Sequence, residues 1–119
     1  MNICNLVEQA HRTAKENGFW NDWAYVLDLY DNVHDDDIIF PKAMELNAIN
    51  SRLALISSEV GEAVEALRHE DCDNLAEELA DIIIRVADLC GGIGIDLEET
   101  IKWKMEKNEG REYRHGKSM

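Results

Sequence analysis

The sequence predicts an all-α protein built as a four-helix bundle. Three observations support this prediction: apolar residues recur three and four positions apart, helix-capping residues stand at the starts of these segments, and no segment alternates apolar and polar residues as a half-buried strand would. The 119 residues suit a single domain, which we expect to span residues 1–119. We expect helices at about residues 2–17, 41–69, 74–90 and 96–109.

The first expected helix, residues 2–17, begins at Asn2 and ends before Gly18, a residue type common just after helix ends. Residues 19–40 are expected to be irregular, although a few apolar residues between 23 and 30 have the spacing of a short helix. Pro41 opens the second expected helix, because its missing amide costs nothing in a first turn. The apolar residues of that helix form the seam of a bundle: Leu46, Ile49, Leu53, Ile56, Val60, Ala63 or Val64, and Leu67.

The last two expected helices each begin with an apparent capping box. Asn74 stands three residues before Glu77, and Asp96 stands three residues before Glu99. The third helix is expected to end at Gly91-Gly92 and the fourth near Gly110. The third helix is apolar in almost every direction, and a small four-helix monomer rarely encloses one helix completely. We therefore expect a homo-oligomer, a dimer or a tetramer, formed through buried apolar helix faces.

Composition and charge exclude several classes of protein. The formal net charge of −13 argues against a nucleic acid partner, because phosphates would be repelled at long range. No run approaches the roughly 20 apolar residues of a membrane span. The three cysteines are scattered and no signal sequence is recognisable, so we expect a cytoplasmic protein with reduced thiols. Basic residues concentrate between Lys102 and Lys117, which would suit a small anionic ligand or an ordinary basic helix.

Two pairs of acids are the candidate metal ligands. Glu59 and Glu62 lie one turn apart on the second expected helix, and Glu78 and Asp81 lie one turn apart on the third. If the two helices run antiparallel, the pairs face each other at one level. Four converging carboxylates repel one another, and hard divalent cations that prefer oxygen ligands, Mg²⁺ or Mn²⁺, would offset this cost. Solvated acids that share this spacing by chance, or neutralisation by nearby bases, are the alternatives.

The acids also carry a resemblance to a known family. Ser58-Glu59-Val60-Gly61-Glu62 followed by Glu78-Leu79-Ala80-Asp81 resembles the ExxE…ExxD signature of MazG-type nucleotide pyrophosphohydrolases. These enzymes belong to an all-α superfamily that also includes dimeric dUTPases and phosphoribosyl-ATP pyrophosphohydrolase. Gly18-Phe19-Trp20 and the tail that contains Lys104, Asn108, Arg111 and His115-Gly116-Lys117 extend the likeness to about residues 18–117. The chain departs from the family pattern at Ser58, where the family has another acid, so the identity of the general base is open.

The resemblance implies a function and a set of site residues. Glu59, Glu62, Glu78 and Asp81 would hold Mg²⁺ and serve catalysis, with Glu59 orienting the attacking water. The reaction would convert a (deoxy)nucleoside triphosphate into a monophosphate and pyrophosphate, which is expected to cleanse the nucleotide pool. The expected substrate-binding residues are Lys104, Asn108, Arg111, Trp20 and His115. For Phe19 and Trp20, packing in the core is the alternative to stacking on a base. Lys104, Asn108 and Arg111 form one basic stripe of the fourth helix, and for this stripe the alternative is a solvated helix face.

Other functions are compatible with parts of the pattern. A di-iron carboxylate bundle would need Glu-x-x-His, and no histidine stands three residues after Glu59, Glu62 or Glu78. A non-catalytic acidic helical interaction module would also have apolar helix faces. Within the enzyme class, a specialist for phosphoribosyl-ATP or dUTP remains open, because the sequence does not identify the residues that choose the base.

Overall fold

The computed structural model describes residues 1–32 and 38–111, and over these residues it contains helices and no strand. The helices are α1 (Ile3–Glu16), α2 (Asn21–Asp31), α3 (Ile39–Arg68), α4 (Cys72–Ile93) and α5 (Leu97–Glu109). The prediction of an all-α protein is therefore confirmed. The expected irregular segment 19–40 was wrong in part, because residues 21–31 form α2, whose buried Val26 packs toward α3.

Side chains cap the starts of α1, α4 and α5, and one of the predicted caps was wrong. The side chains of Asn2 and Asp96 accept hydrogen bonds from the backbone amides of Asn5 and Glu99, as expected for the N-caps of α1 and α5. The N-cap of α4 is Asp71, whose Oδ1 accepts from the amide of Asn74 at 3.0 Å. The predicted cap at Asn74 was wrong because the stronger carboxylate acceptor three residues earlier satisfies that amide.

Helix α4 also continues beyond the predicted end. Gly91 and Gly92 lie inside the helix, which ends at Ile93 with Gly94 in the left-handed conformation at φ 77°. A Cβ atom on Gly92 would lie 2.0 Å from Cη2 of Trp20, and a Cβ atom on Gly91 would lie 2.7 Å from Cβ of His11. These two glycines allow close approach of His11 on α1 and of Trp20, and they do not end α4.

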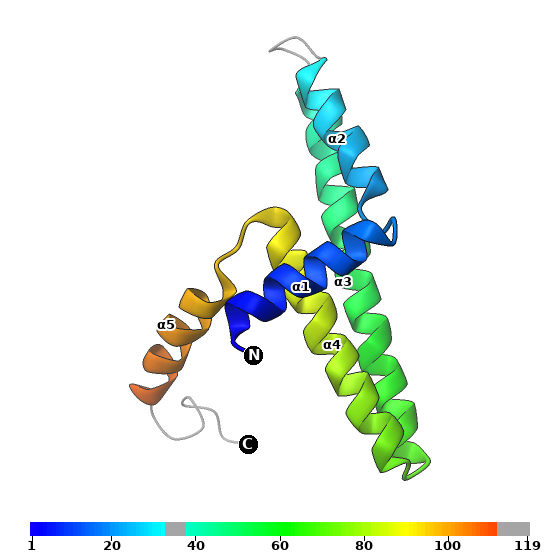
Figure 1. The fold of residues 1–119 in the computed structure, drawn as a ribbon, viewed down its shortest axis with the longest axis vertical. Coiled ribbons are helices and arrows are strands. Elements are labelled where there is room, and N and C mark those ends of the chain that lie inside the picture. Colours follow the sequence, from blue (N-terminus) through cyan, green and yellow to red (C-terminus); the bar gives the residue numbers. More distant parts are fainter. Residues whose placement is uncertain (33–37, 112–119) are drawn as a thin grey trace.

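Helices α3 and α4 form a long antiparallel hairpin around which the other helices are placed (Figure 1). Helix α1 crosses α4, α2 packs on the first half of α3, and α5 contacts α1 on the side away from α3. The Cα radius of gyration is 17.8 Å, well above the value of about 13–14 Å expected for a compact chain of this length. Within one chain the described helices do not close into a four-helix bundle.

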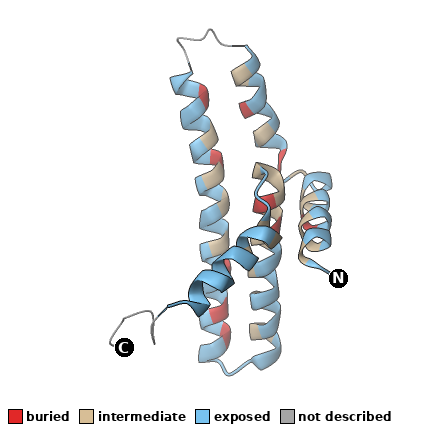
Figure 2. Cartoon of the chain, turned by 90° about the vertical axis from the view of Figure 1, so that its left-hand side faces the viewer, coloured by how far each residue is buried: buried red, intermediate tan, exposed pale blue. Residues whose placement is uncertain are grey.

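The core of a single chain is small, and the outer helix faces are exposed (Figure 2). The buried face of α3 consists mainly of small and polar residues, among them Ala48, Glu59, Ala63 and Ala66. Most of the predicted apolar seam lies on other faces that solvent reaches: Leu46, Leu53, Val60, Val64 and Leu67. Helix α4, expected to be buried on all sides, exposes Leu79, Ile83 and Ile84 in the single chain. Over the described residues, no helix is long and apolar enough to cross a membrane.

Candidate active site

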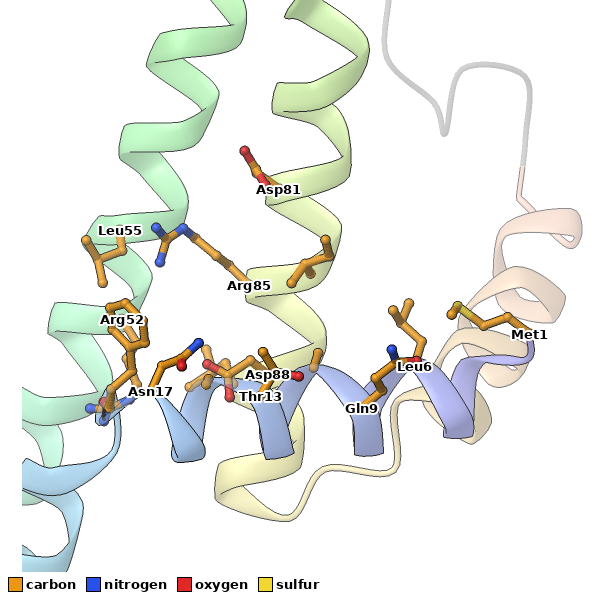
Figure 3. A pocket seen from close by; sticks show the side chains of 15 residues that line it. Met1, Leu6, Gln9, Thr13, Asn17, Arg52, Leu55, Asp81, Arg85 and Asp88 are labelled. Atoms are coloured by element: carbon orange, nitrogen blue, oxygen red, sulfur yellow. Dashed lines mark hydrogen bonds between the residues drawn. The ribbon is translucent and has the colours of Figure 1, made fainter.

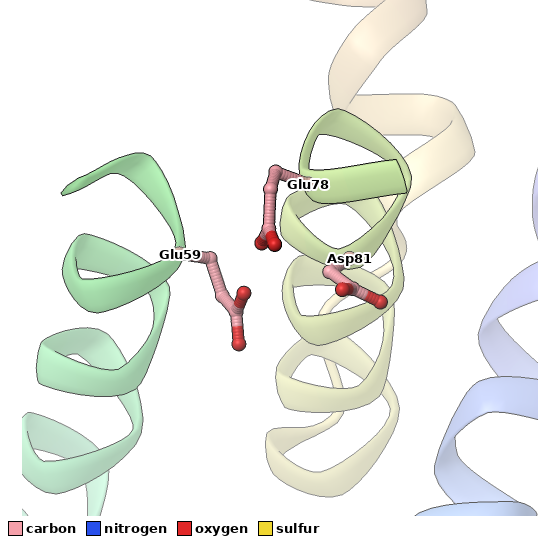
Figure 4. Close-up of side chains that lie close together, drawn as sticks. All are labelled: Glu59, Glu78 and Asp81. Carbon is pink, nitrogen blue, oxygen red and sulfur yellow. The ribbon is translucent and has the colours of Figure 1, made fainter. Parts of the chain in front are cut away.

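The α3–α4 hairpin brings three of the four predicted acids together. Helix α3 ends at Arg68 and α4 begins at Cys72, so the chain reverses within one turn. Glu59 on α3 then faces Glu78 and Asp81 on α4, and one carboxylate oxygen from each lies within 4.8 Å of the others (Figure 4). The i,i+3 spacing of Glu78 and Asp81 places both on the face of α4 that meets α3.

Glu59 is the best buried of these acids, with 9% of its surface exposed. Arg85, one turn beyond Asp81, donates a hydrogen bond of 2.8 Å from Nε to Oε1 of Glu59. This bond holds the pKa of the Glu59 carboxyl below its ordinary value, so the group is an anion. Its other oxygen, Oε2, is buried and has no hydrogen-bond partner among the described residues.

Glu78 has the opposite electrostatic environment. Sharing of a proton with Glu59, together with burial and the nearby charge of Glu62, raises the pKa of Glu78 to about 7. The buried Oε2 of Glu78 also lacks a partner in the described structure when both carboxylates are ionised. The neighbouring carboxylates of Glu59 and Glu78 thus need either a shared proton or a cation between them.

Glu62 lies one turn beyond Glu59 on α3 and is exposed, as Asp81 is, whereas Glu59 and Glu78 are less accessible. It lies outside the group of three converging carboxylates, but close enough that its charge acts on Glu78. The structure therefore places all four acids in one region and three of them in direct convergence.

The residues present fit a hard divalent cation. The converging ligand atoms are all oxygens, which Mg²⁺ and Mn²⁺ prefer, and two of the oxygens are buried without a donor. Arg85 is the one cation that bonds this group in the described residues, and one positive charge cannot offset three carboxylates. Burial of polar atoms without partners is costly, so the cluster has the composition of a metal site.

A cavity of about 430 Å³ adjoins the acid cluster (Figure 3). It lies between α1, α3 and α4, and Asp81 and Arg85 belong to both the cluster and the cavity wall. The lining is largely apolar and is completed by a few polar side chains. Most lining residues come from three helices: from α1, Leu6, Gln9, Ala10, Thr13 and Ala14; from α3, Arg52 and Leu55; from α4, Asp81, Ile84, Arg85, Asp88 and Leu89. Met1, Asn17 and Phe19, which lie outside these helices, complete the lining. A cavity of this size and character is typical of small-ligand sites.

The two aromatic residues considered for base stacking lie differently. Phe19 lines the cavity and is 61% exposed. Trp20 is buried, with 5% of its surface exposed, and its ring packs against Gly92. Its Nε1 donates to Asp88 at 2.7 Å, and the Arg52 guanidinium lies 3.9 Å from the centre of its ring. The position of Trp20 in this chain is that of a core residue, the alternative that the sequence left open.

The predicted basic stripe is not part of this cavity. Lys104 and Asn108 lie on α5 and Arg111 follows it; all three are exposed, and none lines the cavity. Lys104 and Arg111 are close enough that the charge of Arg111 lowers the pKa of Lys104. The stripe therefore forms a local concentration of positive charge apart from the acid cluster (Figure 1). His115 lies outside the described residues.

Several functional candidates were missed at the sequence level, chiefly Asp88 and Arg52. Asp88 continues the face that carries Asp81 and Arg85, at positions i, i+4 and i+7 of α4, so the helical period could have indicated it. Arg52 bonds both carboxylate oxygens of Asp22, at 2.7 and 3.1 Å, and these bonds lower the pKa of Asp22. The residues of α1 could not be found in this way, because the crossing of α1 over α4 depends on tertiary packing.

The fold and the site together define an all-helical protein with a cluster of converging carboxylates beside a cavity of small-ligand size. The family model of the MazG nucleotide pyrophosphohydrolase domain matches residues 48–115, more than half of the chain and all of the predicted acids. The chain belongs to this family. Members are nucleotide pyrophosphohydrolases and generally depend on divalent metal ions. Comparisons with curated proteins and with solved structures gave no match.

Proposed function

We propose that this protein hydrolyses (deoxy)nucleoside triphosphates between the α- and β-phosphates, in the presence of Mg²⁺, to a nucleoside monophosphate and pyrophosphate. The observation that carries the proposal is the pair of buried, unpartnered oxygens of Glu59 and Glu78 beside the cavity. Family membership supports the general activity, and the cavity supports a nucleoside-sized ligand. The proposed role is cleansing of the cytoplasmic nucleotide pool.

Each side chain of the cluster has a proposed task. Glu59, Glu62, Glu78 and Asp81 would hold Mg²⁺, with Mn²⁺ as a substitute of similar ligand preference. The bound ion supplies charge stabilisation for the phosphoryl oxygens and the leaving pyrophosphate. Arg85 holds the carboxylate of Glu59 through Oε1 and leaves Oε2 free, which suits Glu59 to orient the attacking water. The apolar walls of the cavity would bind the nucleoside and exclude bulk water.

We further propose that the working form is a homo-oligomer, either a dimer or a tetramer. Large apolar side chains are exposed along α3 and α4 of the single chain, and an exposed apolar area of this extent is unusual for a monomer. The basic stripe on α5 would then act on a site of a neighbouring copy, where Lys104, Asn108 and Arg111 would bind the triphosphate. His115 is proposed to belong to the same phosphate-binding group.

A substrate panel tests the proposed function. The purified protein is incubated with Mg²⁺ and each canonical deoxynucleoside triphosphate, together with dUTP and phosphoribosyl-ATP, and the products are separated. Monophosphate and pyrophosphate in equimolar amounts, and no activity in excess EDTA, are expected. Release of orthophosphate, or no turnover of any compound, would refute the proposal and favour a non-catalytic module.

A further inference from the structure

Asp88 is an acid on the cavity wall that the proposed reaction does not use. It lies on α4 two turns beyond Asp81, at the end of the cavity that α1 closes (Figure 3). Its side chain is 19% exposed. Burying a carboxylate to this degree is costly unless it is hydrogen-bonded, so its partners indicate what it does.

Both hydrogen bonds of Asp88 converge on a single oxygen. Trp20 donates from Nε1 to Oδ1 at 2.7 Å, and Nδ1 of His11 lies 3.0 Å from the same atom. Trp20 is itself fixed between Arg52 and Gly92, so the orientation of the carboxylate is set by buried groups. Oδ2 has no hydrogen-bond partner in the described parts of the chain, and it is the oxygen that remains for a ligand.

The other polar groups of the cavity do not compete with Asp88 as a charged acceptor for a ligand. Gln9, Thr13 and Asn17 on the α1 side are neutral and can donate or accept. Arg52 is engaged by Asp22, and Arg85 is engaged by Glu59. Asp88 and Asp81 are the acids that line the cavity, and Asp81 belongs to the cation cluster. Asp88 is therefore the acid of the cavity wall that lies outside the cation cluster.

From this arrangement we propose that Oδ2 of Asp88 accepts a hydrogen bond from the exocyclic amino group of the substrate base. The inference rests on the proposed function and narrows its substrate class to nucleotides of cytosine, adenine or guanine. Uracil and thymine have no exocyclic amino group and carry a carbonyl oxygen at position 4, where cytosine has its amino group. A carboxylate, which only accepts, would be left facing that carbonyl oxygen. The site would therefore select against dUTP and dTTP.

The spacing along α4 suits this assignment. Asp81 and Asp88 are seven residues apart, a rise of about 10.5 Å along the helix axis. A nucleoside placed with its phosphate end at the Asp81 cluster can reach Asp88 with the edge of its base. Apolar side chains, including Ile84 between the two acids, would contact the sugar and the face of the base.

The first test compares two substrates on the unmodified protein with Mg²⁺. dCTP and dUTP have the same sugar and phosphates and differ at position 4 and in the protonation of N3 of the ring. We expect kcat/KM for dCTP to exceed that for dUTP by at least about tenfold, the loss that follows from one hydrogen bond to a charged group. Equal rates, or a preference for dUTP, would overturn the inference.

The second test changes the carboxylate. Asp88→Asn keeps the size of the side chain and an oxygen that can accept from Trp20, and it puts an amide donor in place of Oδ2. The dCTP/dUTP ratio is expected to fall by about tenfold or to reverse. Asp73→Asn, a matched change at an exposed position in the first turn of α4, is expected to keep the ratio. An unchanged ratio in folded Asp88→Asn would contradict the role of Asp88.

A binding measurement separates this inference from the proposed function. Titration calorimetry of the unmodified protein and of Asp88→Asn with dCMP and with dUMP needs no turnover. Tighter binding of dCMP to the unmodified protein, lost in the variant, would support the role of Asp88 even if no triphosphate were hydrolysed. If the protein hydrolyses triphosphates but prefers neither cytosine nor uracil nucleotides in either assay, the proposed function stands and the role of Asp88 in base selection is rejected. If Asp88→Asn does not fold, the two comparisons on the unmodified protein decide.

Discussion

Arg85 and Glu59 face each other across the α3–α4 hairpin, with 2.8 Å between Nε of Arg85 and Oε1 of Glu59. The arginine satisfies one oxygen of the carboxylate and leaves the other buried without a hydrogen-bond partner among the described residues, while Glu78 and Asp81 lie close to the same carboxylate. One guanidinium among three carboxylates leaves an excess of negative charge. The predictions on metal dependence follow from this excess.

Removal of single ligand charges should abolish turnover and leave the fold intact. We expect Glu62→Gln, Glu78→Gln and Asp81→Asn each to lower kcat/KM by at least about 100-fold, because even groups that only support metal ligands contribute about 10–100-fold. Pyrophosphate release measures the loss. The melting temperature of the metal-free protein should not fall, because each change removes repulsion between carboxylates.

The matched control for these variants is Glu65→Gln on α3. Glu65 is exposed and pairs with Arg68 and His69 on the surface, so its loss should affect neither stability nor activity measurably. Full turnover in Asp81→Asn or Glu78→Gln would disprove the assignment of the cation site.

The raised pKa of Glu78 predicts that Mg²⁺ binding releases a proton. In the metal-free folded protein this group ionises at about 7, and an ordinary glutamate in the unfolded chain ionises at 4.5. Between these values the folded state binds the additional proton, so the free energy of unfolding falls as the pH rises through this window. Mg²⁺ must displace the proton, so its affinity should rise with pH up to about 7.

Calorimetry at pH 6 in two buffers with different ionisation enthalpies measures that proton release. The apparent binding enthalpies should differ for the unmodified protein and agree for Glu78→Gln, which has no proton to release. Identical enthalpies in both buffers for the unmodified protein would rule out a protonated Glu78 in the metal-free site.

The contact between Gly92 and Trp20 predicts that any side chain at position 92 causes a severe packing defect. Gly92→Ala would place Cβ 2.0 Å from the Trp20 ring, so α4 or the ring must move. We expect a loss of about 1–3 kcal/mol of unfolding free energy, as for other overpacked cores, measured by urea denaturation. Gly110→Ala serves as control, because its Cβ would make an ordinary contact of 3.7 Å. Equal stability of the two variants would argue against the close packing of Trp20 on α4.

Helical periodicity predicted where the helices of this protein lie better than it predicted what each helix packs against. It indicated which residues of α3 share an apolar face, but Leu53, Val60 and Leu67 are exposed in the single chain. A sequence period identifies a face and says nothing about what covers it. The same limit applies to α4, where the glycines at 91 and 92 were interpreted as a helix end because the bulky partners that require them, His11 and Trp20, are distant in sequence.

The acid cluster was more predictable than the cavity. Glu59, Glu78 and Asp81 converge because two i,i+3 pairs on an antiparallel hairpin with a short turn must meet, and this geometry is local. The cavity needs the crossing of α1 over α4, which no local pattern encodes. The helical period could have indicated Asp88 on the face of Asp81, but its hydrogen bond with Trp20, 68 residues earlier in the chain, depends on tertiary packing.

The basic stripe on α5 predicts a defect in substrate binding. Lys104→Ala should raise KM by roughly tenfold with a smaller effect on kcat, because it removes a charge-assisted donor to the triphosphate. Steady-state kinetics with Mg²⁺ and dCTP measure the change. Lys102→Ala, also exposed on α5 but off the stripe, is the control. An unchanged KM in Lys104→Ala would remove this residue from the proposed phosphate-binding group.

The exposed seam of α3 predicts self-association. The unmodified protein should sediment as a species of at least twice 13.6 kDa, because burial of the apolar faces of α3 and α4 stabilises an assembly by about 25 cal/mol per Å². Val60→Glu places a charge on that seam and should shift the protein toward monomers in analytical ultracentrifugation. Asn5→Glu adds the same charge at an exposed polar position of α1 and should leave the assembly unchanged. A stable monomer of the unmodified protein with full activity would contradict both the assembly and the need for α5 of a neighbouring copy, since Lys104 would then have to act within its own chain.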